Sequence, residues 1–361
     1  MAPSRCTLAA LLVSRVVTAV MDKVPLVTDE TALATDETTL VTAFYPIKSK
    51  FVRDVYLEWI KAFVTLVCPR IVVFTSSEMA PIITALRPDG LSPMHVVVLE
   101  FEELESWKRW QTVWKQHHAL DPERSYHTPE LYALWAQKPF FVSRAIDVNP
   151  FRTKFFMWCD IGVFRSPPSD HTRNSFPTST FLQTDRLLML AIAPLQADDD
   201  VVHADGIRGD FSFPAVRNGG GVFGGGKPAH ARWLSAYCAQ IEAYISARRF
   251  AGKDQSVMLS TYLNDRSLAF FVRATDRGDP WFFLTRLCCS GSSADALVLD
   301  TTYAPESQTS QHKFASVPSC DITVDVSRDA DGAAVYTFTS PQRSLASVAP
   351  RANYSYGPAP G

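Results

Sequence analysis

The sequence of 361 residues contains no Cys-x-x-Cys motif, and its seven cysteines are an odd number. These two facts argue against a zinc site and against a disulfide framework, and they favour a reducing compartment. The chain also has no excess of positive charge, because 35 basic residues face 37 acidic ones and the net charge is −2. Without a basic field, nucleic acid is excluded as the main partner. We therefore expect a cytoplasmic protein that does not bind nucleic acid.

Long apolar runs are missing as well. The stretch 7–20 is largely apolar, but Ser14 and Arg15 interrupt it, and it is too short and too broken to predict a membrane span. Two interpretations stay open: a flexible or weakly helical leader, and a poor signal-like segment or anchor that would associate the chain with a membrane. The next stretch, 24–39, is rich in Thr, Asp and Glu and is typical of a low-complexity linker. We assign residues 1–38 to a flexible leader and linker.

The rest of the composition is ordinary for a soluble globular protein, and the order of the expected elements indicates its fold class. Apolar residues make up 47% of the chain and charged residues 20%, which suits a sizeable core. From residue 39 onward, short apolar runs alternate with stretches of helical spacing, and this order predicts βαβ units and a mostly parallel central sheet. Strands are expected at 40–45, 70–75, 94–99, 154–159 and 187–193, and helices at 51–67, 78–86, 102–118, 129–146 and 229–247. Pro139 lies inside one of these helices and predicts a kink or a late start.

The composition changes after residue 290, where Ser, Thr, Ala and Pro become frequent. The segments 321–326 and 333–339 alternate as two strands do, and Asp-Ala-Asp-Gly at 329–332 predicts a turn between them. We therefore assign 39–290 to a single α/β domain and 291–340 to an extension with a small β-hairpin. The tail, 341–361, is expected to be disordered.

A single acid follows the apolar run 155–159. This acid is Asp160, and Gly162 comes two residues later. In parallel sheets, ligands bind beyond the carboxyl ends of the strands, so Asp160 is a candidate ligand of a metal or a polar substrate. The alternative interpretation is a core strand whose Asp160 only begins a turn.

Six glycines surround Val222 and Phe223, and they match no phosphate-binding motif. The spacing from Gly221 to Lys227 fits a phosphate loop, but Pro228 stands where a hydroxyl must bind Mg²⁺. The dinucleotide-binding spacing also occurs, but a poor strand precedes it. What remains is a backbone that can approach an anion or sugar hydroxyls closely, or a bulged strand without a ligand.

Two acidic segments are further candidates. Asp254 and Gln255 begin an apolar helix at 257–263, where an aspartate is often only an N-cap. The segment 197–205 carries four acids and His203, which suits either a metal site or a solvated loop. The sequence alone does not choose between these interpretations.

Four stretches occur together in one order, and as a set they resemble the HtrL/YibB (WlaTC-like) family of bacterial and viral glycosyltransferase-like proteins. The resemblance covers about residues 39–288, and its most specific part is Trp-x-Asp-Ile-Gly-x-Phe-Arg at 158–165. The stretches are Thr42-Ala43-Phe44; 134–141 followed by Asn149-Pro150-Phe151; 158–165; and 220–225 followed by 252–258.

The resemblance implies a GT-A fold and an enzyme, a glycosyltransferase. Such an enzyme moves a sugar from a nucleotide-diphospho-sugar donor to a glycan or other hydroxyl acceptor. It also implies Mn²⁺ or Mg²⁺, held by Asp160 in the place of an Asp-x-Asp motif, to neutralise the leaving diphosphate. Only one carboxylate is present at that motif, so a second ligand is expected from Asp205, His203 or Asp254. The alternative is a non-catalytic relative that binds a nucleotide sugar or a glycan.

The same resemblance implies roles for the other site residues. Asp254 is the expected general base of an inverting reaction, and Gln255 is expected to bind sugar hydroxyls. Lys138 and Arg165 are expected to reach a phosphate. The remaining substrate-binding residues are Thr42, Ala43 and Phe44, at the base and ribose, and Gly220, Gly221 and Gly225, at the donor sugar or the acceptor.

Overall fold

The computed structural model describes residues 37–48, 50–195, 197–209, 216–274, 278–290 and 292, together with four later strand segments at 296–299, 323–328, 334–340 and 343–344. Residues 1–36 of the predicted leader and linker, the tail beyond 344 and the predicted turn at 329–332 lie outside these residues, whereas Thr38 already belongs to the first strand of the sheet. Within the described part of the chain, no helix combines the length and the apolar character needed to cross a membrane.

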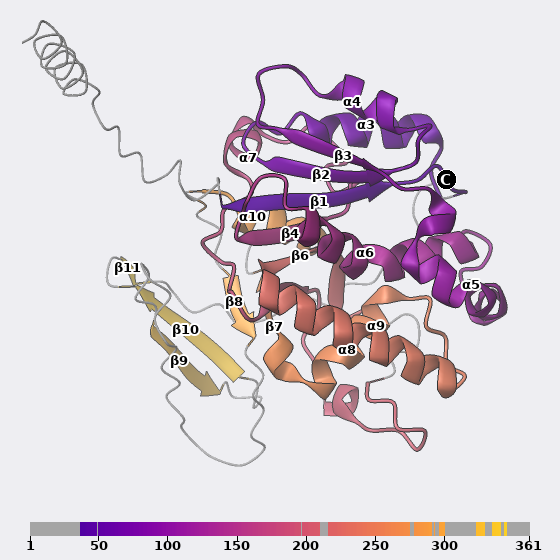
Figure 1. Ribbon diagram of the computed structural model, residues 1–361. Coiled ribbons are helices and arrows are strands. Elements are labelled where there is room, and N and C mark those ends of the chain that lie inside the picture. The colour runs from indigo at the N-terminus through magenta and orange to yellow at the C-terminus, as the bar shows by residue number, and fades with distance from the viewer. Residues whose placement is uncertain are drawn as a thin grey trace, which may run out of the picture.

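An eight-stranded sheet runs through the molecule in the order β3-β2-β1-β4-β6-β5-β7-β8 (Figure 1). Six strands run in one direction, while β6 and β8 run against them. The predicted α/β class with a mostly parallel sheet is therefore confirmed. The strands are β1 (Thr38–Phe44), β2 (Arg70–Thr75), β3 (Met94–Val98), β4 (Phe155–Cys159), β5 (Leu187–Ala191), β6 (Asn218–Gly226), β7 (Ala269–Ala274) and β8 (Ala296–Leu299).

Helices cover both faces of this sheet (Figure 1). Residues of α3, α4 and α10 join the apolar cluster on one face, and residues of α5, α6, α8 and α9 join the cluster on the other. The helices are α3 (Arg53–Val64), α4 (Ala80–Leu86), α5 (Glu105–His117), α6 (Pro129–Val148), α7 (Asp170–Ser175), α8 (Lys227–Ser246), α9 (Asp254–Asn264) and α10 (Phe283–Leu287).

The alternation of side chains along each strand builds the two clusters. On β4, Phe156 and Trp158 belong to the cluster under α6 and α8, whereas Met157 and Cys159 belong to the opposite one. Successive side chains of a strand point to opposite faces, so an apolar run such as 155–159 is the pattern of a strand covered on both sides. Cys159 is fully buried and packs as a small core residue.

Several expected elements differ in detail from those found. The helix α6 starts at Pro129, with Thr128 as its cap, and continues through Pro139 to Val148, so the late start does not occur. The short helix α7 and the strand β7 were not predicted. Four residues, 265–268, separate β7 from α9, and the apolar run 269–272 was not distinguished from the apolar helix before it.

The C-terminal segments form the predicted antiparallel pair. Strand β9 (Thr323–Arg328) pairs with β10 (Ala334–Ser340), and β10 also pairs with β11 (Arg343–Ser344). Strand β8 belongs to the main sheet, which therefore continues past residue 290 into the expected C-terminal extension. The division of the chain into domains stays a prediction.

We expect His230 to make the stability of the fold depend on pH. Its ring is buried on α8, Nε2–H donates to the carbonyl of Phe156 at 2.9 Å, and burial lowers the pKa from 6.5 to about 4. His230 is therefore protonated below about pH 6.5 in the unfolded chain, but only below about pH 4 in the folded protein. Stability is fully present above this window, and by pH 5 about 2 kcal/mol is lost.

Urea unfolding at pH 7.5 and pH 5 measures this effect. The His230→Gln variant, whose amide can donate to the same carbonyl, should lose about 2 kcal/mol less than the wild type between these two pH values. The control is His95→Gln, because His95 lies exposed on β3. Equal losses in the wild type and in His230→Gln would show that His230 does not cause the pH dependence.

Candidate functional site

Asp160 lies where β4 ends, at the carboxyl edge of the parallel strands. Its backbone N–H donates to the carbonyl of Gly221 at 2.7 Å, and its own carbonyl accepts from Val163 at 2.9 Å. The side chain keeps 41% of its surface exposed. Asp160 does begin a turn, as the alternative interpretation states, but its carboxylate is also open to solvent at the edge where ligands of such sheets bind.

Trp158 holds one oxygen of this carboxylate in place. Its Nε1–H donates to Oδ1 of Asp160 at 2.7 Å. The indole lies flat against the ring of Phe141 on α6, with centroids 5.8 Å apart and planes 7° from parallel. The Trp158 indole, which stacks on Phe141 in the core, therefore orients the Asp160 carboxylate.

Lys138 joins Asp160 to two other elements. The side chain leaves the middle of α6 and is only 6% exposed. Its ammonium lies 2.9 Å from Oδ2 of Asp254, 3.0 Å from the carbonyl oxygen of Gly220, and 3.2 and 3.3 Å from Oδ1 and Oδ2 of Asp160. An ammonium has three N–H donors, and these three residues use all of them.

Asp254 is the buried partner in this group. It is the first residue of α9, and its side chain is 5% exposed. One oxygen accepts from Lys138, and the other accepts from the backbone N–H of Gln255 at 2.9 Å. The predicted proximity of Asp254 to Asp160 is thus present, although both oxygens of Asp254 are engaged.

A bulge in the glycine strand brings backbone to these charges. Strand β6 pairs Phe223 with Met189 of β5 and then Gly219 with Leu190, so 220–222 have no partner on that side. A bulge of this kind redirects the chain locally and is frequent beside active sites. Gly220 leaves no room for a side chain, because a Cβ there would lie 2.6 Å from Oδ2 of Asp254.

The three charges influence one another's protonation. Burial alone would lower the pKa of Lys138, but the carboxylates of Asp160 and Asp254 outweigh burial and raise it. Burial raises the pKa of Asp160, and Asp254 acts in the same direction, while Lys138 and the Trp158 N–H oppose them. Solvent around the exposed part of Asp160 weakens all of these effects. Lys138 is therefore a cation that two carboxylates share.

Arg165 lies five residues beyond Asp160 and has a different setting. Its exposed guanidinium lies over three aromatic rings, 5.3 Å from the centroid of Trp59, 5.6 Å from that of Phe282 and 6.0 Å from that of Phe51. Among the described residues, no hydrogen bond or ion pair engages it. Its N–H groups are thus available for an oxyanion, as the prediction for Arg165 requires, whereas those of Lys138 are already used.

The other predicted residues are spread along the sheet. Thr42, Ala43 and Phe44 end β1, the parallel neighbour of β4, so they reach the same edge as Asp160. The Thr42 hydroxyl is buried and has no hydrogen-bond partner among the described residues. Gly225 pairs with Phe156 inside the sheet, where a Cβ would meet Leu187, so the structure does not bring it to Asp160.

The acidic segment 197–205 is held by arginines. Asp199 pairs with Arg217 at 2.7 Å, and Asp205 pairs with Arg249 at 2.5 Å. Asp200 accepts from both Arg208 and Arg266. These pairs explain Asp199, Asp200 and Asp205 as anchors of the loop that follows β5. Of the candidate second ligands, Asp254 is the one that shares a contact, the Lys138 ammonium, with Asp160.

The donor set of the site can be compared with the needs of a divalent ion. In the ranges described, no group of three or more His, Cys, Asp or Glu side chains is arranged to hold a metal. Asp160 nevertheless keeps 41% of its side chain exposed, and Mg²⁺ is often bound by one or two carboxylates while water and substrate phosphates complete its shell. The residues present therefore fit an ion that arrives with a diphosphate.

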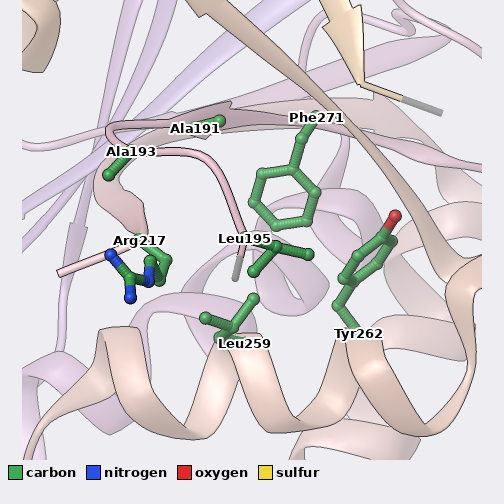
Figure 2. Close-up of a pocket in the computed structure, with 7 residues that line it drawn as sticks. All are labelled: Ala191, Ala193, Leu195, Arg217, Leu259, Tyr262 and Phe271. Carbon is green, nitrogen blue, oxygen red and sulfur yellow. The ribbon is translucent and has the colours of Figure 1, made fainter. Parts of the chain in front are cut away.

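Two hollows lie away from Asp160. A cavity of about 20 Å³ lies between β5, β7 and α9, and its lining is apolar apart from Arg217 (Figure 2). This volume suits one water molecule, not a sugar nucleotide. A hollow of about 530 Å³ lies where β4 begins, lined by Arg152, Lys154 and Lys227 among others, and it holds no carboxylate.

Trp158 and Phe141, which were not selected from the sequence, could have been found there by their spacing from Asp160 and Lys138. Trp158 and Asp160 are two residues apart, so a strand places them on one face. Lys138 and Phe141 are three residues apart on a helix, so they also share a face. The contact of Lys138 with the Gly220 carbonyl could not have been predicted, because every residue has a backbone carbonyl and the sequence does not mark the one that is used.

Comparisons with known proteins add little to this geometry. No protein-family model matches the chain, and no curated protein matches it. Among solved structures, the apo form of mouse xyloside xylosyltransferase 1 aligns with a TM-score of 0.34 and 10% sequence identity, over 64% of this chain and 83% of that chain. A likeness this remote carries no argument about fold or function, so the resemblance to the HtrL/YibB family rests on the sequence motifs alone.

Proposed function

We propose that this protein is a glycosyltransferase of GT-A type that moves a sugar from a nucleotide-diphospho-sugar donor to a glycan or other hydroxyl acceptor. The observation that carries the proposal is the convergence of Asp160, Asp254 and the Gly220 backbone on Lys138 at the carboxyl edge of the sheet. These four residues come from three of the four stretches on which the family resemblance depends, and the stretches lie far apart in the sequence.

Each residue then has a role that its surroundings allow. Asp160 is exposed and oriented by Trp158, so it meets the donor. Arg165 is held by aromatic rings with its N–H groups open, so it binds the diphosphate. At the same edge, Ala43 and the backbone of Thr42 and Phe44, whose side chains are buried, meet the base and ribose, and Gln255 binds sugar hydroxyls.

Asp254 has two possible roles in the transfer. It positions Lys138 and, through that lysine, Asp160. It acts as general base only if the bond from Lys138 or from Gln255 gives way to an acceptor hydroxyl, because both of its oxygens are engaged.

Asp160 is the residue that would hold Mn²⁺ or Mg²⁺ on its exposed side. A bound ion would neutralise charge on the departing diphosphate. The chain itself contributes a net charge of −1 from Asp160, Asp254 and Lys138, and this charge disfavours a bare diphosphate near Asp160. Arg165 offsets part of that repulsion.

An assay of donor hydrolysis and transfer tests the proposal. UDP- and GDP-sugars are incubated with the full chain, with and without Mn²⁺, and release of the nucleoside diphosphate is measured. We expect turnover with at least one donor. The Asp160→Asn variant should lose about a hundredfold or more, because removal of one electrostatic contact to the reacting groups has an effect of that order.

The matched control is Asp89→Asn, because Asp89 is exposed after α4 and far along the chain from the site residues. It should turn over like the wild type. Absence of turnover with every donor, together with donor binding seen by calorimetry, would favour the non-catalytic alternative. Turnover that is unchanged in Asp160→Asn would contradict the role of Asp160.

A further inference from the structure

The surroundings of the Lys138 ammonium have the form of a cation site. Four oxygens from three residues lie within 3.3 Å of Nζ: two from Asp160, one from Asp254 and the carbonyl of Gly220. Two of the three residues carry a negative charge, and the third presents a carbonyl dipole. Hard oxygen ligands with this charge are what Mg²⁺ and Mn²⁺ prefer.

The cation that fills this set of oxygens is part of the chain. Lys138 enters from the interior on α6, and its charged end is 6% exposed, while Asp160 on the other side is 41% exposed. A divalent ion between the two carboxylates would have to share their oxygens with an ammonium about 3 Å away, and this repulsion is strong where little water intervenes.

We infer that Lys138 is a built-in cation that occupies the position between Asp160 and Asp254 and thereby keeps divalent ions out of it. The inference deepens the proposed function, and it rests on that function only where it says that an ion arrives with the donor. The free protein then binds no divalent ion tightly. An ion bound during the reaction meets Asp160 alone, from the solvent side.

Lys138 is a positioning residue in this view. It gives the two carboxylates different roles. The charge of Asp254 is neutralised in the interior, while the exposed side of Asp160 stays available to an ion that arrives with the donor. Removing its charge should turn the pair of carboxylates into a divalent-ion site.

Titration of the full chain with Mn²⁺ alone tests the inference. The electron paramagnetic resonance signal of free aqueous Mn²⁺ falls as the ion is bound. We expect the wild type to bind with a dissociation constant weaker than about 1 mM. Lys138→Met should bind at least about tenfold more tightly, and Lys138→Met/Asp254→Asn should return to the level of the wild type.

Lys138→Met leaves two facing carboxylates and is at risk of misfolding. Lys138→Gln therefore serves as a second variant, because its amide still donates to the Gly220 carbonyl while its charge is gone. It too should bind Mn²⁺ more tightly than the wild type, and Mn²⁺ should raise its unfolding temperature. Lys61→Met, a change at an exposed lysine on α3, is the control and should leave Mn²⁺ binding as in the wild type.

Tight Mn²⁺ binding by the free wild type would overturn the inference, and so would binding that is no tighter in Lys138→Gln than in the wild type. Neither measurement uses a sugar donor. If the donor assay shows no turnover while these titrations give the expected results, the proposed function fails and the role of Lys138 as a built-in cation stands.

Discussion

We expect Asp254→Ala to lower the free energy of unfolding by about 3–5 kcal/mol, and Lys138→Met to lower it by a similar amount. Each change leaves a buried charge without a partner. In Asp254→Ala, Lys138 keeps only the half-exposed Asp160 and one carbonyl; in Lys138→Met, the Asp254 carboxylate, 5% exposed, keeps only the Gln255 N–H. Urea unfolding followed by tryptophan fluorescence measures both.

The double variant separates the ion pair from simple loss of packing. Asp254→Ala/Lys138→Met contains no unpaired buried charge, so its loss should be smaller than the sum of the single losses by at least about 1 kcal/mol. The control is the exposed pair Arg53–Glu78, 3.0 Å apart, where the coupling should stay below about 1 kcal/mol. Additive losses at Lys138 and Asp254 would show that the two side chains do not depend on each other.

Alanine at Gly220 should destabilise the protein by about 1–3 kcal/mol, whereas alanine at Gly221 should change stability by less than about 1 kcal/mol. A Cβ on Gly220 would lie 2.6 Å from Oδ2 of Asp254 and 3.4 Å from Sδ of Met258. The carboxylate cannot move aside freely, because Lys138 and the Gln255 N–H hold it. On Gly221 the nearest atom, Oδ2 of Asp160, is 3.3 Å away, so a shift of a few tenths of an ångström would accommodate the Cβ.

The two glycines are neighbours in one strand, and both lie in the bulge of β6, so each serves as the control for the other. The midpoints of urea unfolding compare them directly. Equal stability of Gly220→Ala and Gly221→Ala would contradict the close contact between the Gly220 backbone and Asp254. The comparison also tests whether glycine is needed here for space, because neither residue has the positive φ that would call for glycine on conformational grounds.

Much of the fold could be predicted because its signals are local. The runs that became β1, β2, β3 and β4 are apolar and β-branched or aromatic, and helical spacing separates them, so their order alone indicates a parallel sheet. The strand β7 was not predicted because it is a short apolar run four residues after an apolar helix, and periodicity alone does not tell two such segments apart. The glycine strand β6 was ambiguous because six of its nine residues lack a side chain to show which face is buried.

The candidate site was predicted in part. Asp160, Asp254 and the glycines were selected from their places in the sequence, and the structure brings Asp160, Asp254, Gly220 and Gly221 together. Lys138 was expected to reach a phosphate, but its ammonium contacts Asp160, Asp254 and Gly220 instead. Sequence spacing does not show which neighbours a residue in the middle of a helix will have after packing. The acids of 197–205 show the same limit, since their arginine partners come from other elements.

The sequence by itself determined most of the elements and the edge of the sheet at which Asp160 lies, because hydrophobic period and the order of elements along the chain can be read locally. Only the tertiary structure decided what surrounds that carboxylate. Gly220 lies 82 residues after Lys138 in the sequence, and Asp254 lies 116 residues after it. The packing of α6 and α9 on one face of the sheet, over β6, brings oxygens of both residues within 3.0 Å of the Lys138 ammonium. A buried ammonium needs such partners, and no local pattern names them.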